Sequence, residues 1–287
     1  VFLSGEQDRM AQLAAISEGG DDFLTKPVQP EQLVTAVRSR IQRARILPIL
    51  SRIVVESDAA PFSVQSPLES ESIIQFAHSL SPNGNVERLF VNMWCSVHGL
   101  AGHTHGFPLP NAGERLLAGR AFAEHVFTRP FDPPETRRVV EVNFPGFPPV
   151  FEDRHEWQGP ETLLQLPANA SWLDDSLRLD SAPIVFGTDR TDANMHVNSL
   201  VYPRIFMDAA LRRLWDHDKR HALRANALEV SFRKPSFAGE RTHIALRTFV
   251  AGDRVGATLM LVGDEDAQRP LQFAKPRVFG RIWFVKE

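Results

Sequence analysis

The sequence of 287 residues predicts an α+β protein, and three observations carry this prediction. Residues 181–287 pass from the helical spacing of apolar residues to the two-residue period of strands. Residues 1–48 alternate strand and helix patterns, as an α/β fragment does. The hydrophobic content is 43%, which is normal for a folded protein with a core, so a disordered chain is not expected.

The C-terminal region, residues 181–287, is expected to hold one long helix and an antiparallel meander. Val201, Ile205 and Ala209 recur at helical spacing opposite a polar stripe, which predicts a helix at residues 200–215. Later apolar residues alternate with polar ones, which is the strand period. The expected strands are residues 183–186 before the helix and residues 228–232, 241–250, 254–262 and 271–284 after it, the last broken near Pro276.

The loop before this helix is the candidate site. Alternate side chains of an extended loop share a side, so Asp192, Asn194 and His196 are expected to converge while Val197 faces the core. A carboxylate, an amide and an imidazole on one edge can form an acid–base group. The helix start next to them offers backbone N–H groups and a positive dipole end, which suit an oxygen that gains negative charge.

The pattern Asp-x-Asn-x-His-Val-Asn-x-x-x-Tyr, from Asp192 to Tyr202, resembles the signature of acyl-ACP thioesterases and related hotdog-fold enzymes. The resemblance covers residues 181–287 and implies a hotdog domain that cleaves acyl thioesters of coenzyme A or acyl carrier protein, with no cofactor. It implies catalytic roles for Asp192, Asn194 and His196. Substrate binding is assigned to Asn198, Ser199 and Tyr202.

Structural roles for the same residues remain alternatives. Asp192 can be a turn residue, His196 a structural histidine and Tyr202 a core residue, while Asn198 can cap the helix or orient the loop. Plant-type acyl-ACP thioesterases place a Glu-Cys pair on the strand after the helix, where this chain has Pro235 and Ser236. The reaction therefore stays open between hydrolysis, acyl transfer and dehydration on one scaffold, and a non-catalytic acyl-CoA-binding regulatory module is a further alternative.

Residues 1–48 resemble the C-terminal half of a two-component response-regulator receiver domain. The resemblance rests on the residues FLSG at positions 2–5 and GDDFLTKP at positions 20–27, with helices expected at residues 6–17 and 30–41. It implies that Ser4 is the switch hydroxyl, that Lys26 is the phosphate-contacting lysine and that the bond from Lys26 to Pro27 is cis. A receiver's phosphoacceptor aspartate belongs to earlier strands that this sequence does not include, so no phosphorylation is expected.

The middle of the chain is expected to hold a linker at residues 49–67 and a degenerate hotdog half at residues 68–180. The latter region has the length of one hotdog unit, which predicts a double hotdog: an intrachain pseudo-dimer, with a homodimer as the alternative. Strands are expected at residues 91–97 and 137–144, and a helix or strand at residues 113–127.

Three histidines in this region, His98, His103 and His105, suggest a metal site. No obvious fourth ligand or paired-cysteine spacing accompanies them, so a polar or substrate-facing loop is the preferred interpretation and no metal is expected.

Composition limits the partners. There are 32 Lys and Arg against 35 Asp and Glu and no basic block, so nucleic-acid binding is not expected. No apolar run approaches the ~20 residues that cross a bilayer, and no signal peptide is visible, so a membrane is not expected either. The single cysteine, Cys95, has no partner for an internal disulfide, which is typical of a cytoplasmic protein.

Overall fold

The computed structural model describes residues 2–4, 23–25, 46–59, 63–102, 110–144, 146–192, 196–219 and 222–286. The chain divides into two compact units. The first comprises Val1–Ile49, Leu80–Leu89 and Val126–Val150, and the second comprises Leu50–Ser79, Phe90–His125 and Phe151–Glu287. The candidate site lies in the second unit.

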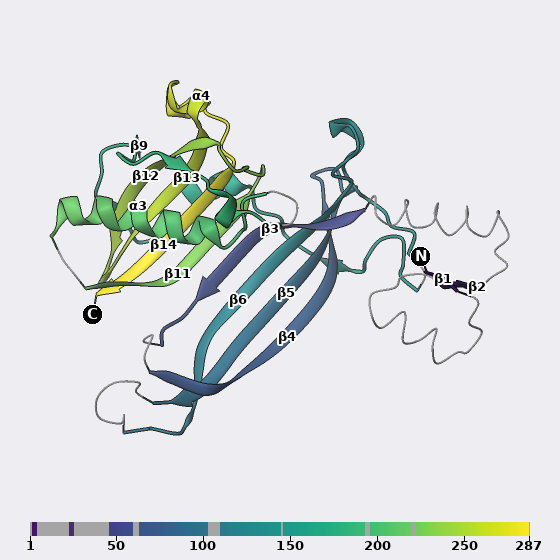
Figure 1. Cartoon of the computed structure of the whole chain (residues 1–287), viewed down its shortest axis with the longest axis horizontal. Coiled ribbons are helices and arrows are strands. Elements are labelled where there is room, and N and C mark those ends of the chain that lie inside the picture. Colours follow the sequence, from purple (N-terminus) through teal and green to yellow (C-terminus); the bar gives the residue numbers. More distant parts are fainter. Residues whose placement is uncertain are drawn as a thin grey trace. The chain divides into compact units, whose positions relative to one another are not determined.

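One long helix packed on an antiparallel sheet forms the C-terminal half, as the sequence predicts (Figure 1). The helix is α3 (Val201–His217), and the sheet order is β10-β12-β13-β14-β11 with every neighbour antiparallel. The strands are β10 (Ile184–Val185), β11 (Leu223–Phe232), β12 (Arg241–Ala251), β13 (Arg254–Gly263) and β14 (Val278–Lys286). This is a hotdog-like arrangement.

The expected meander is wrong in one respect. Strands β12, β13 and β14 follow one another in the sheet, but β11 pairs with β14 instead of β12. The chain therefore crosses from one end of this set of strands to the other between β11 and β12. The predicted break near Pro276 is confirmed, because β14 begins only at Val278, after the 3₁₀ turn η4 (Leu271–Phe273). A one-turn helix, α4 (Asp264–Ala267), follows β13.

The core of this half lies between α3 and the sheet. Phe206, Ala209 and Ala210 of the helix are fully buried, together with sheet residues such as Leu246 and Leu259. A glycine on β14 makes the close approach feasible: a Cβ on Gly280 would lie 2.6 Å from two ring carbons of Phe206. The helix can thus sit directly on the sheet where the strand has no side chain.

The sheet continues beyond β11 through β3 (Leu47–Glu56), whose residues Arg52 to Glu56 pair antiparallel with Ser231 to Ala227. The order from there is β3-β6-β5-β4-β7. These strands are β4 (Val64–Leu80), β5 (Val86–Ala101), β6 (Arg115–Thr128) and β7 (Asp153–Arg154), and Figure 1 shows the first three as long neighbouring strands. The order β3-β6-β5-β4 repeats the order β11-β14-β13-β12.

Other short elements complete the described chain. Strands β8 (Ser171–Trp172) and β9 (Arg178–Leu179) both pair with β12. The remaining 3₁₀ turns are η1 (Pro134–Thr136), η2 (Pro160–Leu164) and η3 (Thr188–Arg190). None of the helices in the described ranges combines the length and the apolar character that a membrane span requires.

Several expectations for the middle of the chain need correction. Residues 49–67 are not simply a linker, because β3 occupies Leu47–Glu56 and β4 begins at Val64. Of the residues 113–127, expected as helix or strand, 115–127 form strand within β6, and the strand expected at residues 91–97 is confirmed within β5. Residues 137–144 form no strand and contribute only an isolated bridge between Thr128 and Arg138.

At the start of the chain, β1 (Phe2–Ser4) and β2 (Phe23–Thr25) pair in parallel, as two strands joined by a crossover do. The two helices expected at residues 6–17 and 30–41 lie outside the described residues, as does the bond between Lys26 and Pro27.

Candidate functional site

The loop that begins at Asp192 is held by its own backbone. The Asp192 N–H donates to the His196 carbonyl at 2.8 Å, and the Asp192 carboxylate accepts the His196 N–H at 3.1 Å. Thr191 and Val197 form a bridge just outside this pair. Asn194, the third predicted catalytic residue, lies outside the described residues. These contacts show Asp192 in the turn role, which is one of the two roles that the sequence left open.

His196 is half-buried and is supported from a second segment of chain. It forms an antiparallel bridge with Phe237, and the two rings meet edge to face at 5.2 Å and 75°. The neighbouring Val197 N–H donates to the Ser236 carbonyl at 2.8 Å, and Val197 is buried, as predicted. The loop is therefore joined to residues 236–237 by backbone contacts, and the imidazole packs against the Phe237 ring.

Asn198 connects the loop to the start of α3. Its side-chain oxygen accepts the Leu200 N–H at 2.9 Å, and its carbonyl accepts the Val201 N–H at 3.0 Å. A helix has four N-terminal N–H groups without an intrahelical partner, and Pro203 has none to offer. Among the described contacts, this count leaves the N–H of Tyr202 as a donor at the positive end of α3.

Tyr202 is a core residue with 2% of its surface exposed. Its ring packs edge to face against Phe186 and Phe232, at 6.2 and 5.6 Å. Burial raises the pKa of its hydroxyl above the ordinary value, although the interaction with Ser236 opposes this effect. The hydroxyl therefore stays protonated at neutral pH. Ser199, assigned with it to substrate binding, is half-buried at the loop end.

Sequence reasoning missed an ion pair that supports this site. Arg277 lies 2.5 Å from the Glu240 carboxylate, and the same carboxylate oxygen accepts the Phe237 N–H at 3.0 Å. Arg277 also donates to the Pro235 carbonyl at 3.1 Å. The pair thus fixes the turn on which His196 rests. Its two members are 37 residues apart and belong to no motif, so the sequence carries no signal for it.

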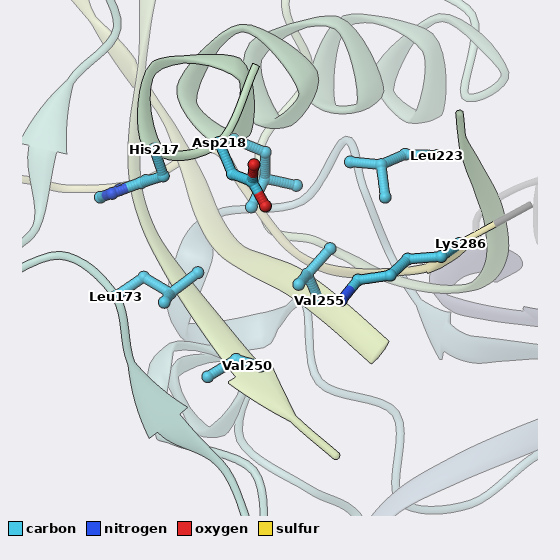
Figure 2. A pocket seen from close by; sticks show the side chains of 8 residues that line it. Leu173, His217, Asp218, Leu223, Val250, Val255 and Lys286 are labelled. Carbon is cyan, nitrogen blue, oxygen red and sulfur yellow. The ribbon is translucent and has the colours of Figure 1, made fainter. Parts of the chain in front are cut away.

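A pocket of about 310 Å³ lies at the opposite end of α3 (Figure 2). Its lining is mostly aliphatic, with three polar residues, and consists of Leu173, Leu214, His217, Asp218, Leu223, Val250, Val255 and Lys286. The 17 residues of α3 span roughly 25 Å at 1.5 Å per residue. The pocket is therefore separate from the loop at Asp192.

A buried aspartate anchors one wall of this pocket. The Asp174 carboxylate accepts the Thr248 N–H and hydroxyl, both at 2.8 Å, and lies 3.0 Å from the imidazole of His217. Burial acts to raise the pKa of Asp174, but the hydrogen bonds from Thr248 and His217 and the charge of Arg213 outweigh it, so the pKa is lowered.

A second buried network joins strands of the other half of the sheet. Glu124 on β6 lies 2.5 Å from the His155 imidazole and accepts the Ser51 hydroxyl at 2.6 Å, while Asn92 contacts the other ring nitrogen at 3.2 Å. Burial opposes ionisation of Glu124, but the contacts with His155 and Ser51 outweigh it and lower its pKa. Its members are far apart in the chain, so no local sequence pattern predicts this network.

Among the described residues, no group of three or more His, Cys, Asp or Glu side chains is arranged so that it could hold a metal ion. His98 is half-buried on β5, and His103 and His105 lie outside the described residues. The expectation of no metal at these histidines therefore stays a prediction.

Sequence comparison gives two curated relatives, and no protein-family model matches the chain. An uncharacterized 76.5 kDa protein in the phbC 3′ region of Thiocystis violacea is 32% identical over 117 residues, which is 41% of this chain and 16% of that protein. The uncharacterized transcriptional regulatory protein YvcP of Bacillus subtilis is 32% identical over 78 residues, or 25% of this chain and 33% of that protein. The chain thus spans a third or less of either relative.

Solved structures resemble most of the chain. A protein assigned as an oleoyl thioesterase from Lactobacillus plantarum matches with a TM-score of 0.50 at 11% identity, over 86% of this chain and 79% of that one. An acyl-ACP thioesterase from Bacteroides thetaiotaomicron has a TM-score of 0.48 at 15% identity over the same shares. The 12:0-ACP thioesterase of Umbellularia californica has 0.46 at 13%, over 97% and 86%. The first of these similarities establishes a shared fold.

Proposed function

We propose that the chain hydrolyses acyl thioesters of coenzyme A or acyl carrier protein at the loop from Asp192 to Tyr202. One observation carries the proposal: the loop that leads into α3 holds His196 against the turn at Phe237, so an imidazole in a defined position comes shortly before the positive end of the long helix along the chain. The hotdog-like fold supports it, because the structures that the chain resembles are named thioesterases.

Each group has a defined task in this reaction. His196 takes a proton from water, and the water oxygen attacks the thioester carbonyl carbon. The carbonyl oxygen gains negative charge, which the N–H of Tyr202 and the dipole of α3 stabilise. The C–S bond then breaks, and the leaving thiolate takes the proton from His196. Asn194 orients the reacting groups, and Asp192 holds the loop by accepting the His196 N–H.

We further propose that β3 to β7 form a degenerate hotdog half, so that the chain is an intrachain pseudo-dimer. The support is the repeated strand order, β3-β6-β5-β4 and β11-β14-β13-β12, joined through the pair of β3 and β11. In the C-terminal half, α3 precedes β11, and residues 26–45, which precede β3, lie outside the described residues.

The test is a panel of acyl-CoA and acyl-ACP thioesters with the parent chain and His196→Ala. Turnover should fall by about 10² to 10⁴-fold in the variant, because a general base is lost, while thioester binding changes much less. His243→Ala is the matched control. His243 is also partly buried, and its imidazole lies 2.7 Å from the Asp264 carboxylate, outside the loop from Asp192 to Tyr202. Equal turnover in parent and His196→Ala contradicts the proposal.

A non-catalytic acyl-CoA-binding regulatory module is the second candidate. It is favoured by the Asp192 carboxylate, which contacts backbone, and by the match to a transcriptional regulatory protein over a quarter of the chain. The same panel separates the two: this candidate predicts acyl-CoA binding with no turnover of any thioester. Product analysis distinguishes hydrolysis from acyl transfer or dehydration.

A further inference from the structure

The pocket at the C-terminal end of α3 is built from several segments of chain (Figure 2). Val250 and Val255 lie opposite each other across the pair of β12 and β13, and Leu223 and Lys286 lie opposite each other across β11 and β14. Leu173 adds an aliphatic side chain from the segment after β8, and the end of α3 forms the remaining wall. Strand pairing therefore holds most of the lining in place before any ligand binds.

The size and the aliphatic walls of this pocket suit a small molecule. Its volume of about 310 Å³ lies at the lower end of the roughly 300–1,000 Å³ that small-molecule sites occupy. Leu173 keeps 37% of its surface exposed. An aliphatic group placed in the pocket would remove such surface from water, which is favourable. The walls therefore select a ligand with a short aliphatic part.

Two opposite charges reach into the same pocket. Figure 2 shows the Asp218 carboxylate and the Lys286 ammonium group directed into it from different segments. Asp218 also follows the C-terminal end of α3, where the helix dipole favours a cation. The third polar residue, His217, is engaged with the protein, since its Nε2 atom lies 3.0 Å from Asp174 and 3.2 Å from the Thr248 hydroxyl. The polar groups of the pocket thus match a ligand that carries both an ammonium group and a carboxylate.

We propose that this pocket binds a free aliphatic α-amino acid such as leucine. The ligand's ammonium group pairs with Asp218, its carboxylate pairs with Lys286, and its side chain contacts Leu223, Val250 and Val255. A fatty acid would leave Asp218 without a partner on the ligand, and an aliphatic amine would leave Lys286 without one. This site is separate from the loop at Asp192 and does not depend on the thioester chemistry proposed there.

An NMR titration of the whole chain with L-leucine tests the binding. For so small a ligand, we expect a dissociation constant on the order of 0.1–1 mM. Three probes each lack one feature of leucine: isocaproate lacks the ammonium group, isoamylamine lacks the carboxylate, and glycine lacks the aliphatic side chain. Each should bind about tenfold more weakly than leucine or worse, because one part of the pocket is left unmatched.

Two charge variants locate the ligand. Asp218→Asn should weaken leucine and isoamylamine about tenfold but should not weaken isocaproate, because only the first two carry an ammonium group. Lys286→Met keeps an aliphatic side chain but loses the charge, so it should weaken leucine and isocaproate about tenfold but not isoamylamine. Both side chains are exposed, so the fold should be kept, and an unchanged melting curve checks this.

Asp216→Asn and Lys275→Met are the matched controls. Both residues are exposed and neither lines the pocket, so both variants should bind leucine as the parent does. The proposal is overturned if leucine does not bind at concentrations up to about 10 mM. It is also overturned if isocaproate or isoamylamine binds as tightly as leucine, or if either charge variant binds leucine as the parent does.

Discussion

One carboxylate oxygen of Glu240 binds both Arg277, at 2.5 Å, and the Phe237 N–H, at 3.0 Å. Phe237 is the residue against which His196 forms its bridge and ring contact. The ion pair thus reaches the imidazole through a single intervening residue. Arg277 adds a bond to the Pro235 carbonyl, so both ends of the short supporting segment are held.

Glu240→Gln tests whether this support matters for turnover. Glutamine keeps an acceptor for the Phe237 N–H but loses the charge that holds Arg277, so the segment under His196 should loosen. We expect kcat to fall about tenfold with KM nearly unchanged, since a small misplacement of a catalytic group is costly. The loss of stability should be only about 1 kcal/mol, because the pair is partly exposed.

Glu265→Gln is the matched control, since Glu265 is exposed on α4. It should leave kcat and the melting temperature unchanged. If Glu240→Gln keeps the parent kcat while its melting temperature drops, Glu240 has only a structural role.

Asp192→Asn and Asp192→Ala separate a chemical role from a turn role. Asparagine can still accept the His196 N–H through its side-chain oxygen, whereas alanine cannot. We expect Asp192→Asn to keep the parent stability and most of its turnover. Asp192→Ala should lose about 1 kcal/mol of unfolding free energy together with turnover. A large loss of turnover in Asp192→Asn at unchanged melting temperature would instead assign the carboxylate to the chemistry.

The sequence predicts those parts of the fold whose pattern is local. Helix α3 and strands β12 and β13 follow directly from helical and two-residue periods, and the structure places them within two residues of the expected ends. Strand β3 was missed because its neighbours come from far along the chain: it lies between β6 and β11. Long-range pairing stabilises such a strand even where turn-forming residues follow it, and no local pattern reports this.

The candidate site also has features that the local sequence predicts and features that it does not. The motif located the loop beside the start of α3 and the burial of Val197, because both depend on neighbouring residues. The contact of the Asp192 carboxylate with the His196 backbone depends on how tightly the loop closes, which spacing alone does not fix. The pair of Glu240 and Arg277 depends on two strand ends meeting in the folded sheet.

Asp174 should make stability depend on acid pH. Its pKa is lower in the folded state than in the unfolded state. Its contribution to the free energy of unfolding is therefore present above the unfolded pKa, about 3.9, and is lost as the pH falls through the folded pKa. We expect Asp174→Asn to lower the unfolding free energy at pH 7 by about 2 kcal/mol, since a buried charged acceptor is replaced. The variant should also lose less stability than the parent between pH 5 and pH 2, by roughly the linkage contribution of one carboxylate.

Denaturant unfolding across this pH range measures the effect. Asp175→Asn is the control, because the Asp175 side chain is exposed one residue further on, and its profile should follow that of the parent. A profile for Asp174→Asn parallel to the parent would show that the carboxylate does not stabilise the fold through its charge.

Gly280 should be intolerant of any side chain, because α3 rests on it. An added Cβ would lie 2.6 Å from two carbons of the Phe206 ring, which is fully buried. We expect Gly280→Ala to lower the unfolding free energy by about 1–3 kcal/mol through overpacking. Gly263→Ala is the control: its Cβ would meet only the Arg277 side chain, at an ordinary 3.7 Å, so the change should stay within about 0.5 kcal/mol.

Combining Gly280→Ala with Phe206→Leu should cost less than the sum of the two single changes, since the smaller side chain relieves the clash. Strict additivity in this cycle, measured by denaturant unfolding, would show that the helix does not pack on the sheet at this residue.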